Sequence, residues 1–123
     1  MATDPRDRIG AAINDGDDDA LVAALRSGSH HGKPGVNAAT KRWTAERLRQ
    51  RDGDGSPTLL DTALRYSANH EPMLRSIACV LLARLWDLDR ASVTDRAITL
   101  AADLDWEVRE WAASIFGLAL DSN

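Results

Sequence analysis

Two side chains near the C-terminal end of the sequence are of types that can act together chemically. Trp106 and Glu110 stand four residues apart, and residues at that spacing project from the same face of a helix. An indole ring offers a flat surface for stacking, and a carboxylate beside it stabilises positive charge that develops in a bound molecule. In the alternative, structural interpretation, Trp106 packs on the preceding helix and Glu110 pairs with an arginine in solvent. We favour this structural interpretation.

A second group of candidates is basic and lies in residues 41–51. Arg42 and Arg49 fall along one stripe of a helix, because positions seven apart are two turns apart, and Lys41 lies alongside. Such a stripe is a candidate surface for phosphate groups or an acidic partner. The other interpretation is a solvated outer face that neutralises the acidic turn at residues 14–19. We favour the solvated face, since only this helix is basic.

Arg75 and Arg109 are candidates of a different kind, because they occupy equivalent positions 34 residues apart. A row of arginines along one face can bind phosphate or carboxylate groups. The same arginines can instead pair with acidic residues of the neighbouring helices, which is a structural role and the one we favour.

Other reactive residue types do not form a recognisable site. Cys79, the single cysteine, lies in the apolar stretch 77–82 and is interpreted as a buried, unreactive thiol. His30 and His31 lie in a Gly-rich segment without acidic or cysteine residues at ligand spacing, so no metal is expected. No Gly-rich phosphate loop follows a strand, and no cofactor is expected.

Composition is that of one domain with an ordinary soluble surface. The chain has 123 residues, of which 44% are hydrophobic, and a net charge of −4. The charge is uneven, because residues 21–51 carry seven basic side chains against one glutamate while both flanking segments are acidic. Neither an apolar run long enough to span a membrane nor a secretory signal is present. We therefore expect a cytoplasmic protein that does not enter membranes.

Helix signals account for most of the chain. Counted from the first capping or helical residue, the expected helices are 5–13, 20–27, 37–51, 56–67, 71–86, 92–102 and 105–120. A shift of 34 residues superimposes the helix starts and the apolar positions, with Ala78 falling on Ala112 and Leu82 on Phe116. Three tryptophans are interpreted as packing residues: Trp43, Trp86 and Trp111.

The repeat predicts the fold class. We expect an all-α solenoid of about three antiparallel helix pairs with period 34, with or without a short extra helix at the N-terminus. Residues 1–123 form a single domain in this prediction, and residues 1–16 are either flexible or a capping segment.

The helix that begins at Asp105 also resembles a known repeat. Its run Asp105-Trp-Glu-Val-Arg-Glu-Trp-Ala112 is similar to the second helix of a HEAT repeat. Together with the run 69–82, it resembles the N-terminal part of the DNA-alkylation-repair family of HEAT-like proteins, which includes glycosylases that release alkylated purines. The resemblance covers residues 37–120. It implies that Trp106 and Glu110 face DNA, with the carboxylate stabilising charge as the glycosidic bond breaks.

Two functions follow as expectations. The first is a non-catalytic, HEAT-like binding module that presents a concave surface to a protein partner. The alternative is a protein that binds the DNA backbone and is active only in a longer chain or an oligomer, because the catalytic relatives use Asp where this sequence has Glu110 and carry a later basic residue. Trp111 and Phe116 on the last helix also suggest self-association through that helix.

Overall fold

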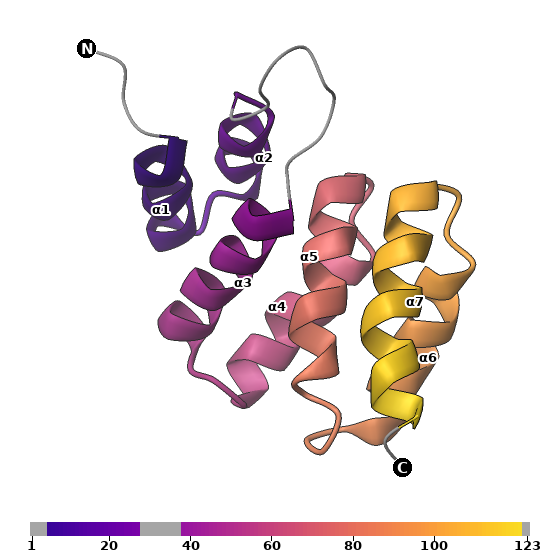
Figure 1. Cartoon of the computed structure of the whole chain (residues 1–123). Coiled ribbons are helices and arrows are strands. Elements are labelled where there is room, and N and C mark those ends of the chain that lie inside the picture. The colour runs from indigo at the N-terminus through magenta and orange to yellow at the C-terminus, as the bar shows by residue number, and fades with distance from the viewer. Residues whose placement is uncertain (1–4, 28–37, 122–123) are drawn as a thin grey trace.

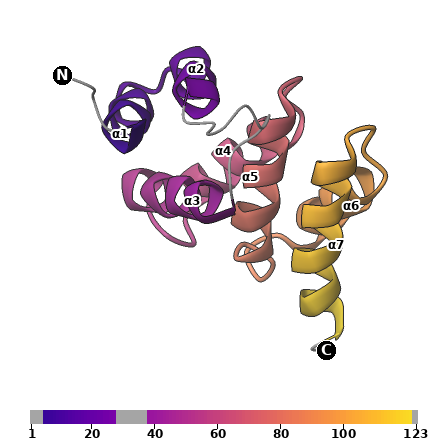
Figure 2. The same ribbon diagram turned by 45° about the horizontal axis from the view of Figure 1, so that its top comes forward.

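The structure, a computed structural model, describes residues 5–27 and 38–121, and within these ranges it is all-α. Neighbouring helices pack in chain order, with the N-terminal helices at one end of the molecule and the last two at the other (Figures 1 and 2). The helices are α1 (Pro5–Asp15), α2 (Asp18–Ser27), α3 (Ala38–Asp52), α4 (Pro57–Ser67), α5 (Pro72–Ala83), α6 (Arg90–Ala101) and α7 (Trp106–Asp121).

Side-chain caps begin several of these helices. The Ser56 hydroxyl accepts a hydrogen bond from the amide of Leu59 at 3.1 Å, and Pro57 occupies the first helical position. At α7, the Asp105 carboxylate accepts hydrogen bonds from the amides of Glu107 and Val108. Both caps confirm the predicted helix starts. The predicted cap Asn37 lies outside the described residues.

Two predicted boundaries around α5 and α6 are wrong. Helix α5 ends at Ala83 rather than near Trp86, because the amides of Arg84 and Leu85 bond to carbonyls three residues back and tighten the chain into turns. The cap of α6 is Asp89 rather than Ser92. The Asp89 carboxylate accepts hydrogen bonds from both the amide and the hydroxyl of Ser92.

In the 34-residue register, residues 20–27 and 37–51 make up the first predicted helix pair, and this pair differs from the structure. Helix α2 packs chiefly against α1 instead of α3, while α3 contacts α1, α4 and α5. The reason is apolar burial, because Ile9 and Ile13 of α1 are buried together with Leu21 and Leu25 of α2. Helix α1 thus supplies part of the core, and α1 with α2 forms the N-terminal hairpin.

The turns before α5 and α7 are built alike, 34 residues apart. Asn69 and Asp103 each accept a hydrogen bond from a backbone amide two residues on, at 2.9 Å in both turns. Arg75 and Arg109 each donate to the backbone carbonyl of the same turn residue, six positions earlier. The 34-residue register therefore extends from the sequence to the hydrogen bonds of these two turns.

Helices α3, α5 and α7 form one layer of the molecule, with α4 and α6 behind α5 and α7 (Figure 1). Ala78 of α5 and Ala112 of α7 are both buried, so the small residues at equivalent positions are packing residues as predicted. Phe116 is also buried and Trp111 is half-buried against the core. Phe116 is therefore covered within the chain and Trp111 is covered in part, while self-association through the last helix stays a prediction.

Candidate functional site

A groove crosses the layer of α3, α5 and α7. It consists of two adjoining cavities, one of about 450 Å³ and one of about 250 Å³, which share Arg42 of α3 and Ser114 of α7. Half-buried Val80 and Ala83 of α5 supply an apolar floor. Helices α3 and α7 form the two walls. We call this feature the α3–α5–α7 groove.

The α3 wall carries mostly basic side chains. Arg42, Glu46 and Arg49 are spaced by four and three residues, which places them on one face of the helix. Arg84, which follows α5, lies at the same cavity, and its Nη2 is 3.5 Å from an Asp54 carboxylate oxygen. Arg49 lies 3.8 Å from the other oxygen of Asp54. Arg42 and Arg49, two of the predicted binding residues, therefore do line a cavity.

The α7 wall contains the tryptophan and carboxylate singled out in the sequence. Trp106 and Glu110 both line the smaller cavity, with Arg42 on the opposite wall. Trp106 is 66% exposed and Glu110 is exposed, so neither side chain is fixed inside the core. Trp106 is thus mostly exposed rather than buried against the preceding helix, and the choice between its two roles stays a prediction. The smaller cavity thus has an exposed aromatic ring, an acidic group and a basic group in its lining.

Lys41 does not belong to this surface. Its side chain is only 1% exposed, and its ammonium donates a hydrogen bond to the Glu107 carboxylate at 3.0 Å. The ammonium also lies 5.3 Å from the centre of the Trp111 ring. Lys41 joins α3 to α7 inside the molecule, so the surface role expected for it is replaced by a structural one.

Arg75 and Arg109 differ although their positions are equivalent. Arg75 holds Asp103 through two hydrogen bonds, from Nε at 2.8 Å and from Nη2 at 2.9 Å. This bidentate pair joins α5 to the turn before α7, which confirms the structural interpretation for Arg75. Arg109 is exposed and bonds only to the Asp103 carbonyl among the described residues. Neither arginine lines the groove cavities.

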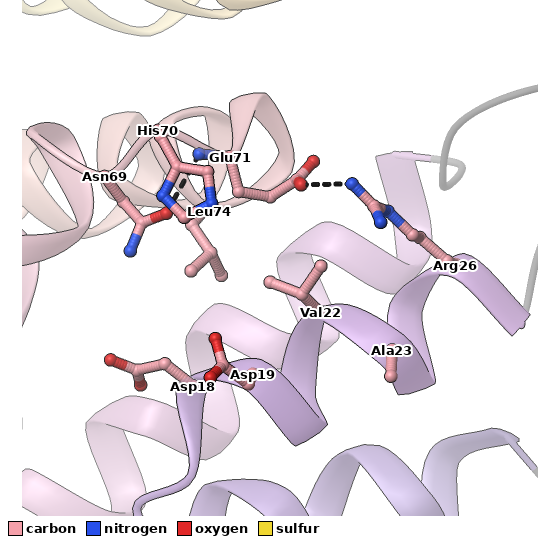
Figure 3. A pocket seen from close by; sticks show the side chains of 9 residues that line it. All are labelled: Asp18, Asp19, Val22, Ala23, Arg26, Asn69, His70, Glu71 and Leu74. Carbon is pink, nitrogen blue, oxygen red and sulfur yellow. Dashed lines mark hydrogen bonds and ion pairs between the residues drawn. The ribbon is translucent and has the colours of Figure 1, made fainter.

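A smaller cavity of about 230 Å³ lies between α2 and the start of α5 (Figure 3). Asp18 and Asp19 lie at the beginning of α2, and an ion pair between Arg26 and Glu71 connects the two helices. The Tyr66 hydroxyl donates to Asp18 at 3.0 Å nearby. The sequence did not predict this cavity, because its walls are brought together by contacts 45 and 48 residues apart.

The structure also adds groove residues that the sequence did not predict, namely Ala38, Glu46, Val80, Ala83, Arg84, Glu107 and Ser114. For Glu46, the sequence signal was its helical spacing from Arg42 and Arg49. Val80 and Ala83 gave no such signal, because the apolar floor is indistinguishable in sequence from the core of α5. Among the described residues, no cluster of histidine, cysteine or carboxylate side chains is arranged to bind a metal.

Cys79 has no part in the groove and should not react in the folded protein. It is fully buried, and burial, together with the charge of Asp103, raises the pKa of its thiol to about 12. We expect a thiol reagent at mildly alkaline pH to label the native chain only as fast as it unfolds, and the denatured chain at once. Rapid stoichiometric labelling of the native chain would contradict this placement.

Comparison with protein-family models, with curated proteins and with solved structures finds no match to this chain. The resemblance to HEAT-like proteins therefore rests on the residues quoted above alone and stays a prediction. None of the helices in the described ranges has the length and apolar character needed to cross a membrane.

Proposed function

We propose that the protein is a non-catalytic binding module that holds a helical segment of a partner protein in the α3–α5–α7 groove. The observation that carries the proposal is the groove itself, with an apolar floor at Val80 and Ala83 between two polar walls. An amphipathic helix laid in such a groove buries its apolar face on the floor and meets the walls with its polar edges. We interpret α4–α5 and α6–α7 as two HEAT-like units that support it.

The charges of the walls favour a polypeptide over a nucleic acid. Arg42 and Arg49 lie on the α3 wall, whereas Glu110 lies exposed on the α7 wall. A helix with an acidic edge toward α3 and a basic edge toward α7 complements both walls. A phosphate backbone is attracted by the arginines but repelled by the carboxylate. The exposed Trp106 ring gives the partner an aromatic anchor site.

Binding is favoured over catalysis because of the surroundings of Glu110. A carboxylate stabilises a developing positive charge most strongly in a site that excludes water. Glu110 is exposed in an open cavity, and its neighbour Trp106 is exposed as well. This environment supports recognition of a surface more than stabilisation of a transition state.

DNA-backbone binding, in a longer chain or an oligomer, is the alternative. The observation in its favour is the exposed Trp106 ring beside Glu110, which is accessible to a nucleotide base. Against it, Lys41 and Arg75 are both engaged in ion pairs within the chain. Of the three arginines at the groove, Arg49 and Arg84 both face Asp54, which leaves Arg42 without a carboxylate partner among the described residues.

Selection of helical peptides from a displayed library against the intact protein tests the proposal. We expect selected peptides to perturb the amide resonances of α3 and α7 in NMR spectra. Trp106→Ala and Arg42→Glu are expected to weaken their binding at least about tenfold, since anchor residues and charge reversals typically account for more than about 1.4 kcal/mol. Arg96→Glu on α6 is the matched control, because Arg96 does not line the groove cavities.

Peptides that bind elsewhere, or equally well to the Trp106→Ala variant, would remove the groove as the functional surface. A titration with a labelled DNA duplex at two salt concentrations tests the alternative. Affinity that falls steeply with salt, and weakens on Arg42→Glu, supports DNA binding. Absence of binding at low salt excludes it.

A further inference from the structure

Two arginines at one end of the α3–α5–α7 groove converge on a single carboxylate. Arg49 Nε lies 3.8 Å from one oxygen of Asp54, and Arg84 Nη2 lies 3.5 Å from the other. Arg49 belongs to the last turn of α3 and Arg84 follows α5, and both line the larger cavity. The loop between α3 and α4, which carries Asp54, comes close to the end of α5 (Figures 1 and 2). The groove therefore ends in two guanidinium groups placed to share one carboxylate.

This contact is looser than the structural ion pair between α5 and the turn before α7. There, Arg75 donates two hydrogen bonds to Asp103, at 2.8 and 2.9 Å. Both distances at Asp54 exceed the usual range of an N–H···O hydrogen bond, which ends near about 3.2 Å. In the described ranges, the side chains of Arg49 and Arg84 donate no hydrogen bond to any residue. Their N–H groups are therefore available to an acceptor that comes closer.

Asp54 is also held weakly on its own side of the contact. Its side chain is 58% exposed, and it stands between Gly53 and Gly55, whose φ angles of 97° and 72° turn the loop outward. The neighbouring Asp52 is different, because it is 7% exposed and accepts a hydrogen bond from the Thr62 hydroxyl at 2.6 Å. Exposed ion pairs contribute little to stability. The Asp54 carboxylate can therefore move into solvent at small cost.

The cavity beside this contact attracts an anion. Three arginines line it and Glu46 is the one carboxylate in its lining. Asp54 is not part of the lining, so it meets Arg49 and Arg84 from outside the cavity, whereas a ligand in the groove meets them from within. Two carboxylates at the same two arginines repel each other. A carboxylate that enters from the groove therefore competes with Asp54.

We propose that Arg49 and Arg84 form a carboxylate-binding subsite of the groove, which Asp54 occupies until an acidic side chain of the partner replaces it. The present occupant indicates the ligand class, a carboxylate with one oxygen toward each arginine. The inference rests on the proposed function for the identity of the partner, a helical segment whose acidic edge faces α3. Replacement requires only that Asp54 turn away, so the helices keep their positions. The subsite selects for an acidic residue at this point, because a basic side chain there meets two guanidinium groups.

Titration of the intact protein with glutarate, followed through the arginine side-chain Nε–H resonances in NMR spectra, tests the subsite without a peptide. We expect glutarate to perturb the resonances of Arg49 and Arg84. Asp54→Asn should bind glutarate about two- to fivefold more tightly, in proportion to the small contribution of an exposed ion pair. Adding Arg84→Gln should abolish this gain. Asp95→Asn is the matched control, because it makes the same charge change at an exposed carboxylate that does not line the groove cavities. Circular dichroism checks that all variants remain folded.

The helical peptides selected against the protein test the partner's side of the contact. Their affinity should rise by a similar factor in Asp54→Asn, and the rise should disappear when their acidic residues are replaced by the corresponding amides. Glutarate bound no more tightly by Asp54→Asn than by Asp95→Asn, or a gain that survives Arg84→Gln, would overturn the subsite. Weaker binding by Asp54→Asn would also overturn it, since Asp54 would then orient the arginines instead of competing for them. Peptide binding without a glutarate effect leaves the proposed function intact, and a glutarate effect without peptide binding leaves the subsite intact, so the two proposals fail separately.

Discussion

Replacing Lys41 with alanine is expected to lower the free energy of unfolding by about 2–4 kcal/mol, although lysine is normally a surface residue. The side chain is 1% exposed and lies between Glu107 and the Trp111 ring. Truncation leaves a cavity between α3 and α7 and removes the charge that Glu107 faces. Lys41→Glu should prevent cooperative folding, because it buries a carboxylate beside another carboxylate. Denaturant titration followed by tryptophan fluorescence measures both effects.

Two variants separate packing from charge at this position. Lys41→Met keeps most of the methylene stem and is expected to cost less than the alanine variant, since Glu107 remains 38% exposed and can be hydrated. Arg42→Ala changes the neighbouring exposed cation and should alter stability by no more than about 0.5 kcal/mol. Equal stability of the wild type and Lys41→Ala would mean that the ammonium lies in solvent.

Local signals determined the parts of the fold that the sequence predicted well. Ser56-Pro57 and Asp105 cap their helices with their own side chains, and each prediction required only neighbours within three residues. Prediction was less successful where tertiary contacts decide the structure. Nothing local to α2 indicates that it packs on α1, because its apolar residues suit either helix.

The candidate site likewise has a part that local spacing predicted and a part that depends on tertiary contacts. The four-residue spacing correctly placed Trp106 and Glu110 on one face, and the structure puts that face at a cavity. Lys41 could not be placed correctly, because its partner Glu107 is 66 residues away and no local pattern distinguishes a buried lysine from a solvated one. The groove depends on where α5 sits between α3 and α7, which is a property of the assembled helices.

The equivalent arginines of the repeat provide the second large stability effect. Arg75→Met is expected to lower the free energy of unfolding by about 2–3 kcal/mol, because it leaves the 10% exposed Asp103 carboxylate without its bidentate partner. Arg109→Met, the same change at the equivalent position, should cost no more than about 0.5 kcal/mol, since Arg109 is exposed. Parallel denaturant titrations compare the two variants, and equal losses would mean that the Asp103 ion pair adds nothing to stability.

The Arg75 effect should also depend on pH. Burial alone would raise the pKa of Asp103. Two kinds of interaction outweigh burial and hold this pKa below its usual value: hydrogen bonds from Arg75 and the Asp105 amide, and the charges of Arg75 and Arg109. Because the folded-state pKa is lowered, the stabilisation is complete above the unfolded-state pKa, about 3.9, and is lost as pH falls through the folded-state pKa. The difference between wild type and Arg75→Met should therefore be constant near neutral pH and shrink below about pH 4. A difference that stays the same down to the acid unfolding transition would show that Arg75 stabilises the fold by packing rather than by its charge.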